Sequence, residues 1–556
     1  MRAGTYVETI DFGGKAIALI GIDGPEETTI DADRNDSVVR FIQGEGREAI
    51  LSGFTITGGR ADNGGGIRIE GAAPRLYHLR ILDNRVWGRR EMERFTNDGG
   101  GIFVSHGAPI LTDVTLAQNV TDLTWCVLDN GNGGGLYAMN GSHLFMDSVV
   151  FQDHHAGDYG DSLEGCQGGR GGAIFLRSSF LFLRRGTFVR NQAGKGRYYW
   201  DRAAEGGDGG AISAVNSLLE VIDTEFRDNE AGEGGSGIIE GGSAYPGCDG
   251  GDGGAISMRD SWGLVEGSIF LGNRTGDGGS GGVSSNDESD VAGDAGRGGA
   301  IFVSGGQIDI LETLLVANRT GDGGVSNVDV GNGGGGGGLY AKGARVHSSN
   351  LIVMANRTGD GGDGASTSDW YCDRYWGHIG APGGNGGGIA LIDSIAELEN
   401  LTLFRNETGK GGDGGDLYSD CVEDPYLPGE PYGDVYAGDG GPGGAGAGLY
   451  LWGGSVSMRN VTMTENETGP GGAGGTFSGE AVGHDGNEGM QGRGGGLAGY
   501  AASFTYNHAW GNLPDDYSGM SDPTGTEGNI TGDPRFVDTS GSDPLAWDLH
   551  LSSDSP

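Results

Sequence analysis

A frame of fixed length that recurs along the chain constrains its fold more than any other feature of the sequence. In one copy, Ile174 opens a short apolar segment and Asn191 follows seventeen positions later. The same spacing joins an Ile or Leu to an Asn in eight other copies, whereas Leu136 reaches Asp153 instead. The stretches between copies vary in length, so insertions collect at one turn of each repeat. This pattern is typical of a solenoid whose inserted loops project from one face.

The residues inside the frame have the period of β-strands. Apolar residues take alternate positions in the first segment, as Ile174 and Leu176 do, and a second segment places one such as Phe188 three positions before the Asn. Period two indicates strands. We therefore predict an all-β fold, a right-handed single-stranded parallel β-helix with long Gly- and Asp-rich loops along one edge. A degenerate eleventh unit opens at Gly494 and is predicted to lack the Asn, because terminal repeats are often atypical.

The Asn that closes each frame is interpreted as structural. An Asn suits a turn that needs left-handed geometry, and stacked Asn side chains can form an amide ladder. We predict one inward-facing column of Asn84, Asn119, Asn191, Asn229, Asn273, Asn318, Asn356, Asn406 and Asn466. The last five also begin N-x-Thr sequons, which are incidental if the amides are buried.

Three of the frames resemble a known family. Gly-Gly-Ala-Ile at 171–174, 209–212 and 253–256, each followed by Phe-x-x-Asn, resembles the GGAI and FxxN repeats of polymorphic outer membrane proteins. More broadly, residues 60–510 resemble bacterial right-handed parallel β-helix proteins of the pectin-lyase-like fold. The resemblance implies one continuous solenoid: opening coils at 1–60, repeat coils at 61–510 and a closing segment at 511–556, with both ends expected to be truncated. It says little about activity, because this fold carries enzymes and non-enzymes alike.

Composition limits the partners. The formal net charge of −42 disfavours nucleic acid and anionic membranes, and we find no membrane-spanning segment or signal peptide. Gly and Pro, 121 and 15 of 556 residues, approach the range that suggests disorder in the loops. All five cysteines fall in loops. We predict bridges Cys126–Cys166 and Cys372–Cys421, with Cys248 left over, and hence an oxidising compartment; the alternative is five unrelated thiols.

Candidate chemistry is sparse. The position after the first apolar residue of each frame should point outward, and no acidic cluster occupies that row, so no catalytic residue is assigned. His154 and His155, beside Asp153, are interpreted as a solvated turn. The outward row holds six aromatic residues, which either form a platform for stacking sugars or pack between coils under the loops: Phe103, Tyr137, Phe175, Phe302, Tyr340 and Tyr450.

The Gly-rich loops suggest one cofactor only. Asp277, Asp322 and Asp360 lie on glycine turns and are weak candidates for Ca²⁺ ligands; the alternative is a solvated acidic fringe. No other cofactor is expected.

These observations favour a non-enzymatic protein, exported or associated with a bacterial cell surface or outer membrane, that acts as a stalk or adhesin. Its loop edge would contact a polysaccharide, a cell-surface protein or neighbouring copies. The alternative is a carbohydrate-active enzyme, a lyase or epimerase acting on acidic polysaccharide. An enzyme would need a groove with converging charged residues and shifted pKa values.

Overall fold

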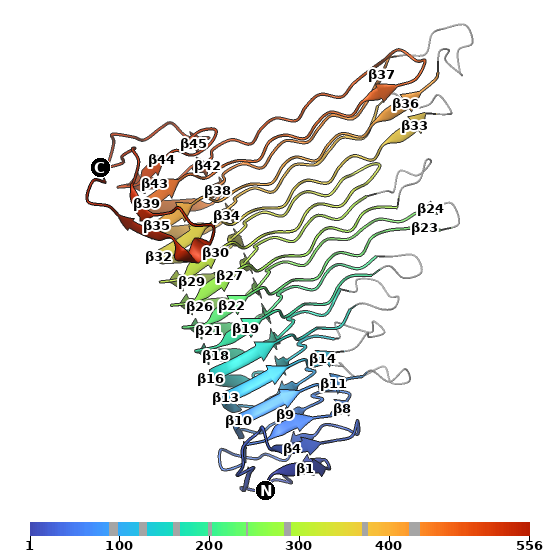
Figure 1. Cartoon of the computed structure of the whole chain (residues 1–556), viewed down its shortest axis with the longest axis vertical. Coiled ribbons are helices and arrows are strands. Elements are labelled where there is room, and N and C mark those ends of the chain that lie inside the picture. The colour runs from blue at the N-terminus through green and yellow to red at the C-terminus, as the bar shows by residue number, and fades with distance from the viewer. Residues whose placement is uncertain are drawn as a thin grey trace.

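The chain is a parallel β-helix with a blade of extended loops on one side (Figure 1). The computed structural model describes residues 1–87, 98–121, 131–158, 167–197, 203–240, 243–282, 291–369, 376–421 and 434–555. The prediction of an all-β parallel solenoid with loops along one edge is confirmed. In the described residues, two large parallel sheets of 14 and 21 strands form the solenoid wall, here called sheet 1 and sheet 2.

Each coil contributes one strand to sheet 1 and one bent or split strand to sheet 2, and pairs in register with the next coil. Ile174 of β17, for example, lies between Leu136 of β15 and Ile212 of β20. Sheet 1 comprises β2 (Ile10–Asp11), β5 (Val39–Phe41), β9 (Ile67–Glu70), β12 (Ile102–Ser105), β15 (Leu136–Met139), β17 (Ile174–Arg177), β20 (Ile212–Val215), β25 (Ile256–Arg259), β28 (Ile301–Ser304), β31 (Leu339–Lys342), β34 (Ile389–Ile392), β38 (Leu449–Trp452), β42 (Leu497–Ala498) and β45 (Tyr517–Ser518).

Sheet 2 comprises β1 (Gly4–Val7), β3 (Ala18–Ile20), β4 (Thr28–Asp31), β6 (Ile50–Ser52), β7 (Thr55–Thr57), β10 (Arg75–Leu82), β13 (Ile110–Ala117), β16 (His143–Gln152), β18 (Phe180–Arg184), β19 (Thr187–Val189), β21 (Leu218–Ile222), β22 (Glu225–Arg227), β26 (Trp262–Glu266), β27 (Ile269–Leu271), β29 (Gln307–Leu311), β30 (Leu314–Val316), β32 (Arg345–Met354), β35 (Ile395–Phe404), β39 (Ser455–Thr464), β43 (Ser503–Thr505) and β44 (His508–Trp510). Small sheets join β8 (Arg60–Ala61), β11 (Arg85–Val86) and β14 (Val120–Thr121); β23 (Ile239–Glu240) and β24 (Ser243–Ala244); β33 (Thr367–Asp369), β36 (Leu417–Ser419) and β40 (Phe477–Ser478); and β37 (Val435–Tyr436) and β41 (Gly483–His484).

Single left-handed residues turn the corners of a coil. In the coil that opens at Ile174 these are Ser178, Arg185 and Arg190, with φ of 48°, 54° and 50°. The left-handed residue at the last corner is thus the one before the Asn, and Asn191 itself is not left-handed, contrary to the expectation from its turn propensity. Because the chain turns at Arg190, the side chain of Asn191 points into the solenoid.

The interior is a dry column of aliphatic and aromatic side chains. Alternate residues of each strand face inward, so Ile174, Leu176, Leu181 and Leu183 are fully buried. Phenylalanines three positions before the column residue stack coil on coil: Phe188 lies 4.9 Å from both Phe151 and Phe226, between ring centroids. Burial of such side chains contributes about 1.5–3 kcal/mol each, which accounts for a stable solenoid despite the modest apolar content.

The Asn side chains form one buried ladder. The amide nitrogen of Asn273, for example, donates to the side-chain oxygen of Asn318 at 2.9 Å and to the carbonyl of Phe226 at 3.0 Å. The same pattern holds between adjacent pairs from Asn191 to Asn466 and continues to Asn512 at 2.8 Å. Asn512 was missed because it follows Leu497 by fifteen positions rather than seventeen.

One position in the ladder is a histidine. His154, not Asp153, stands between Asn119 and Asn191: its Nδ1 accepts from the backbone N–H of Asn119 at 3.1 Å, and the backbone N–H of His154 donates to Asn191 Oδ1 at 3.2 Å. It is buried rather than in a solvated turn. Its ring interacts with the Leu116 carbonyl, but Nε2 makes no hydrogen bond of standard geometry in the described residues.

Beyond the Asn column the chain runs outward, turns, and returns to sheet 1, and these loops pack into a two-layer sheet-like projection that we call the blade (Figure 1). Gly412 of an outgoing segment donates to the carbonyl of Ala381 in a returning segment at 2.8 Å, and Gly441 of the next returning segment donates to Gly412 at 2.8 Å. The contact recurs at Gly415 and Gly438. The contacts along each segment are therefore three residues apart, which is the period of a polyproline II helix.

Glycine is required in the blade by close approach. A Cβ added to Gly412 would overlap the carbonyl oxygen of Gly362, and one added to Gly411 would overlap that of Gly441. The described outgoing segments include 230–237, 274–282, 319–324, 357–366, 407–416 and 467–476, and the returning segments include 203–210, 246–254, 291–299, 329–337, 376–387, 435–447 and 484–495. In the described residues, the Gly-rich loops are therefore packed backbone, and not the disordered segments that their composition suggested.

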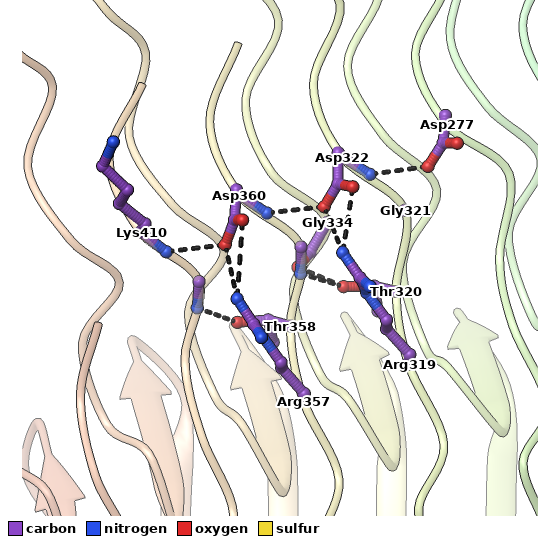
Figure 2. A network of polar contacts seen from close by, with 12 residues as sticks. Asp277, Arg319, Thr320, Gly321, Asp322, Gly334, Arg357, Thr358, Asp360 and Lys410 are labelled. Carbon is purple, nitrogen blue, oxygen red and sulfur yellow. Dashed lines mark hydrogen bonds and ion pairs between the residues drawn. The ribbon is translucent and has the colours of Figure 1, made fainter. Parts of the chain in front are cut away.

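A threonine column anchors the base of the blade. Thr320, two positions after Asn318, is fully buried; its hydroxyl donates to Gly334 O at 2.6 Å and accepts from Gly359 N at 2.8 Å (Figure 2). Thr358 repeats these contacts one coil further on. The N-x-Thr triplets are thus hydrogen-bonding units of the fold.

The end of the chain covers two surfaces. Residues near β45 and Asn529 continue the last coil, since Asn529 accepts from the N–H of Asn507 at 2.8 Å. Antiparallel strands β46 (Phe536–Asp538) and β47 (Asp548–Leu551), with the 3₁₀ turn η1 (Pro544–Ala546), then fold back onto sheet 2, where Phe536 and Trp547 contact Phe404. In the described residues, no helix is long and apolar enough to cross a bilayer.

Candidate functional site

The corner, where returning segments of the blade meet the outward-facing side chains of sheet 1, is the candidate functional site. The space between the returning segments and sheet 1 is narrow: a Cβ on Gly386 of a returning segment would lie 2.7 Å from the Cβ of Ala390 in β34. Most of the predicted aromatic row is therefore covered. Five of its rings are buried, and only Tyr450 is half-exposed: Phe103, Tyr137, Phe175, Phe302 and Tyr340.

These buried rings pack against one another. Tyr137 stacks between Phe103 and Phe175 at 5.7 and 5.3 Å, and Phe302 stacks on Tyr340 at 5.7 Å, all between ring centroids. They stabilise the junction of blade and solenoid, which agrees with the alternative that the rings pack between coils under the loops. They do not form a solvent-facing platform.

Between the two aromatic groups lies a charged cluster that the sequence pattern did not reveal. Asp208, from a returning segment, is 1% exposed and binds the Arg259 guanidinium through two contacts of 3.1 Å. Arg259 also donates to Asp252 at 2.8 Å, and Arg170 lies 3.7 Å from Asp208. Arg297 donates its backbone N–H to Asp252 at 2.9 Å. The buried Asp208 and the partly buried Asp252 are thus brought against Arg259 of β25 and against Arg170 and Arg297 of the returning segments.

The cluster shifts the pKa values of its two carboxyl groups in opposite directions. Burial opposes ionisation of Asp208, but the charges of Arg259 and Arg170 lower its pKa below the ordinary value. Burial and the neighbouring Asp208 raise the pKa of Asp252 to about 6. Such a pair can hold one proton near neutral pH, which is the behaviour that marks candidate acid–base groups as well as structural ion pairs.

A pocket of about 410 Å³ follows the cluster along the corner. Its walls combine Arg297 and Lys342 with Tyr450 and Trp452, and Asn385 lies on the blade side. The Lys342 ammonium is exposed and has no ion-pair partner in the described residues, and Trp452 is 63% exposed. This volume is within the range of small-molecule sites, which typically combine apolar walls with a few placed polar groups.

The three calcium candidates bridge layers of the blade (Figure 2). Asp322 accepts from the N–H of Asp360 at 2.8 Å and binds Arg319, three positions before it, at 2.9 Å. Asp277 does the same with the N–H of Asp322 and with Arg274, and Asp360 with the N–H of Lys410 and with Arg357. The described residues hold no group of three or more His, Cys, Asp or Glu side chains placed to bind a metal ion.

The structure describes two of the five cysteines. Cys421 is disulfide-bonded, and Cys248 is free. Burial raises the pKa of the Cys248 thiol to about 11, which keeps it protonated and unreactive. Cys126, Cys166 and Cys372 lie outside the described residues, so the two proposed pairings remain predictions.

Comparison with known proteins adds little to the geometry. No protein-family model matches the chain, and no curated protein matches it by sequence. Among solved structures, the A-module of mannuronan C-5 epimerase AlgE6 from Azotobacter vinelandii is 10% identical, over 96% of this chain and 90% of that one, with a TM-score of 0.24. Tailspike protein 3 of bacteriophage CBA120 is 9% identical, over 74% of this chain and 53% of that one, with a TM-score of 0.19. At these values neither similarity bears on activity.

Proposed function

We propose that this protein is a non-enzymatic, surface-associated β-helix scaffold of the stalk or adhesin type. One observation carries the proposal: the loops that an enzyme would use as mobile lids are here fixed to one another by backbone hydrogen bonds, as between Gly412 and Gly441. A blade held in this way displays its side chains in regular rows. The disulfide at Cys421 supports an exported or extracellular location, since such bonds persist in oxidising compartments.

The corner pocket is the proposed contact for a saccharide. Trp452 and Tyr450 offer aromatic surface, while Arg297 and Lys342 supply positive charge on an otherwise acidic protein. These groups suit a sugar ring that carries a carboxylate. A cell-surface protein or a polysaccharide would meet the same corner as it approached the returning face of the blade.

The test is a binding measurement with matched variants. Calorimetry with uronate-containing and neutral oligosaccharides is expected to show binding that Trp452→Ala weakens about tenfold, because truncated tryptophans at binding surfaces commonly cost more than ~1 kcal/mol. Trp262→Ala removes a comparably exposed tryptophan from sheet 2, away from the corner, and should leave binding unchanged. Equal effects of both substitutions, or no binding at all, would refute the pocket's role.

The second candidate is a carbohydrate-active enzyme, favoured by the Asp208, Asp252 and Arg259 cluster beside the pocket. An enzyme would form product from an acidic polysaccharide at a steady rate, and Asp252→Asn would abolish that turnover while leaving binding in place. A scaffold forms no product with either protein. The net charge of −42 opposes an anionic polymer beyond the pocket under either proposal, so it does not separate the two.

A further inference from the structure

The N-terminal coils differ in charge from the rest of the chain. Residues 1–200 contain 20 Lys and Arg against 24 Asp and Glu, whereas residues 201–556 contain 15 against 53. The summed charge of a surface sets the potential that an approaching ion meets. An anion is therefore repelled least at the N-terminal coils, and a site for an anionic ligand meets the least opposition there.

A pocket of about 390 Å³ lies in these coils. It is found where β8 pairs with β11, directly after Asn84 of the ladder, on the side of the solenoid from which the blade projects (Figure 1). Its walls include Arg34, Arg60 and Trp87, and it shares no residue with the corner pocket. Its volume is within the range of small-molecule sites.

Backbone hydrogen bonds fix the walls of this pocket. The N–H of Arg60 donates to Asp36 O at 3.0 Å, and the N–H of Arg34 donates to Gly58 O at 2.7 Å. Asp33, Arg34 and Asp36 all have left-handed backbone, with φ of 50°, 62° and 58°. Residues with side chains adopt this conformation at a cost in energy, and such residues cluster at ligand-binding and other functional sites.

Trp87 holds the side chain of Arg60 in place. The Arg60 guanidinium lies 3.4 Å from the centroid of the Trp87 ring. A contact of this kind uses the face of the guanidinium and leaves the N–H groups, which lie in its plane, free to donate to a ligand. Neither Arg60 nor Arg34 forms an ion pair within the part of the chain that the structure describes.

The acidic side chains of the pocket do not neutralise both arginines. Asp36 already has partners: its Oδ2 contacts Arg40 at 2.5 Å, and its Oδ1 accepts from the N–H of Ser37 at 2.8 Å. Asp62 is the one other acidic side chain among the described residues that line the pocket. Two arginines thus face one available carboxylate, which leaves an excess of positive charge in a pocket of an otherwise acidic protein.

We propose that this pocket binds the oxyanion group, a carboxylate or a phosphate, of a small ligand such as a sugar acid or a sugar phosphate. Arg60 is the main donor, because a guanidinium held on an indole presents parallel N–H groups that match two oxygens of either anion. Arg34 adds a second positive charge from the left-handed turn. The site goes beyond the saccharide contact at the corner, since neither pocket needs the other.

Calorimetry with glucuronate, glucose-6-phosphate and neutral glucose tests the site. All proteins carry Trp452→Ala, so that the corner pocket contributes little heat. Saturable binding of at least one anion, and none of glucose, is expected. Tighter binding of glucuronate identifies a carboxylate ligand, and tighter binding of glucose-6-phosphate identifies a phosphate ligand. The proposal is overturned if neither anion binds, or if glucose binds as tightly as the anions do.

Substitutions at Arg60 locate the binding. Arg60→Gln is expected to weaken it at least about tenfold, because hydrogen bonds between charged groups are lost. Arg60→Lys keeps the charge but not the planar set of donors, so it should also weaken binding. Unchanged binding by Arg60→Lys contradicts recognition by the guanidinium.

The matched control is Arg75→Gln. Arg75 is exposed on β10 of the same coil, has no ion pair among the described residues and does not line the pocket, so its loss should leave binding unchanged. Equal effects of Arg60→Gln and Arg75→Gln would mean that net charge alone attracts the anion. Equal melting temperatures show that the variants are folded, and Arg34→Gln, at an exposed turn, provides the same test if an Arg60 variant does not fold.

Discussion

Replacing His154 by Asn is expected to stabilise the protein and to remove a large part of its sensitivity to acid. His154 interrupts the Asn ladder, and its buried Nε2 meets the Leu116 carbonyl without standard hydrogen-bond geometry. An unsatisfied buried polar group costs about 1–3 kcal/mol. An Asn can instead donate to a carbonyl of the preceding coil, as Asn191 does to Phe151 O at 3.1 Å. At neutral pH we therefore expect His154→Asn to raise the free energy of unfolding by about 1–2 kcal/mol.

The pH dependence follows from the same burial. Burial lowers the pKa of His154 from 6.5 to about 4, so the unfolded chain binds the proton first as pH falls. Stability is then full above pH 6.5, declines between 6.5 and 4, and the loss is complete below about 4. A pKa lowered from 6.5 to about 4 corresponds to a loss of roughly 3 kcal/mol of stability in acid. The Asn variant lacks this contribution at any pH.

Urea unfolding at neutral pH and near pH 4 measures both effects. His143→Asn is the matched control, because His143 is exposed on the same strand, β16; it should retain the acid loss of the wild-type protein. If wild type and His154→Asn lose equal stability between the two pH values, the placement of a neutral buried histidine in the ladder is wrong.

Three other perturbations test the ladder, the blade and the calcium candidates. Asn318→Ala should lower the free energy of unfolding by about 3 kcal/mol, because it removes the side-chain hydrogen bonds to Asn273 and Asn356 and leaves the buried backbone N–H of Asn273 without its acceptor; the exposed Asn400→Ala is the control, and equal effects would argue against the ladder. Gly412→Ala should lower the melting temperature through overlap with Gly362 O, whereas Gly46→Ala, with no atom near its Cβ, should not; unchanged melting in both would contradict the packed blade. Calcium and a chelator should leave the melting temperature unchanged, since Asp277, Asp322 and Asp360 already bind arginines; a rise with calcium would reopen a metal role.

The sequence predicts the solenoid well because most coils have the same spacing of seventeen residues between the first strand and the Asn, which reveals the residues that pair between coils. Ladder positions are misplaced only where a corner changes length. The corner between β15 and β16 is one residue longer than the corner after β17, because Leu136 pairs with Ile174 whereas His143 pairs with Phe180. The extra residue moves the column position from Asp153 to His154. A shorter corner after β42 brings Asn512 into the ladder.

The site was harder to predict, because it is assembled from different coils. Asp208, Asp252 and Arg259 meet only when returning segments stack on sheet 1, and loop lengths hide that register. One signal was available: glycine recurs at every third position in 438–444 and 486–492. That period identifies polyproline II packing, where composition alone suggested disorder.

Hydrogen–deuterium exchange of the blade amides tests the central claim most directly. The N–H groups of Gly412, Gly441 and Gly472 each donate to a neighbouring blade segment at 2.8 Å. They are expected to exchange far more slowly than the same sequence in an unfolded peptide, and more slowly than Gly471 and Gly474, whose N–H groups have no acceptor among the described residues. Exchange of the inner glycines at the unfolded-peptide rate would mean that the loops are not packed, and it would contradict the proposed scaffold function.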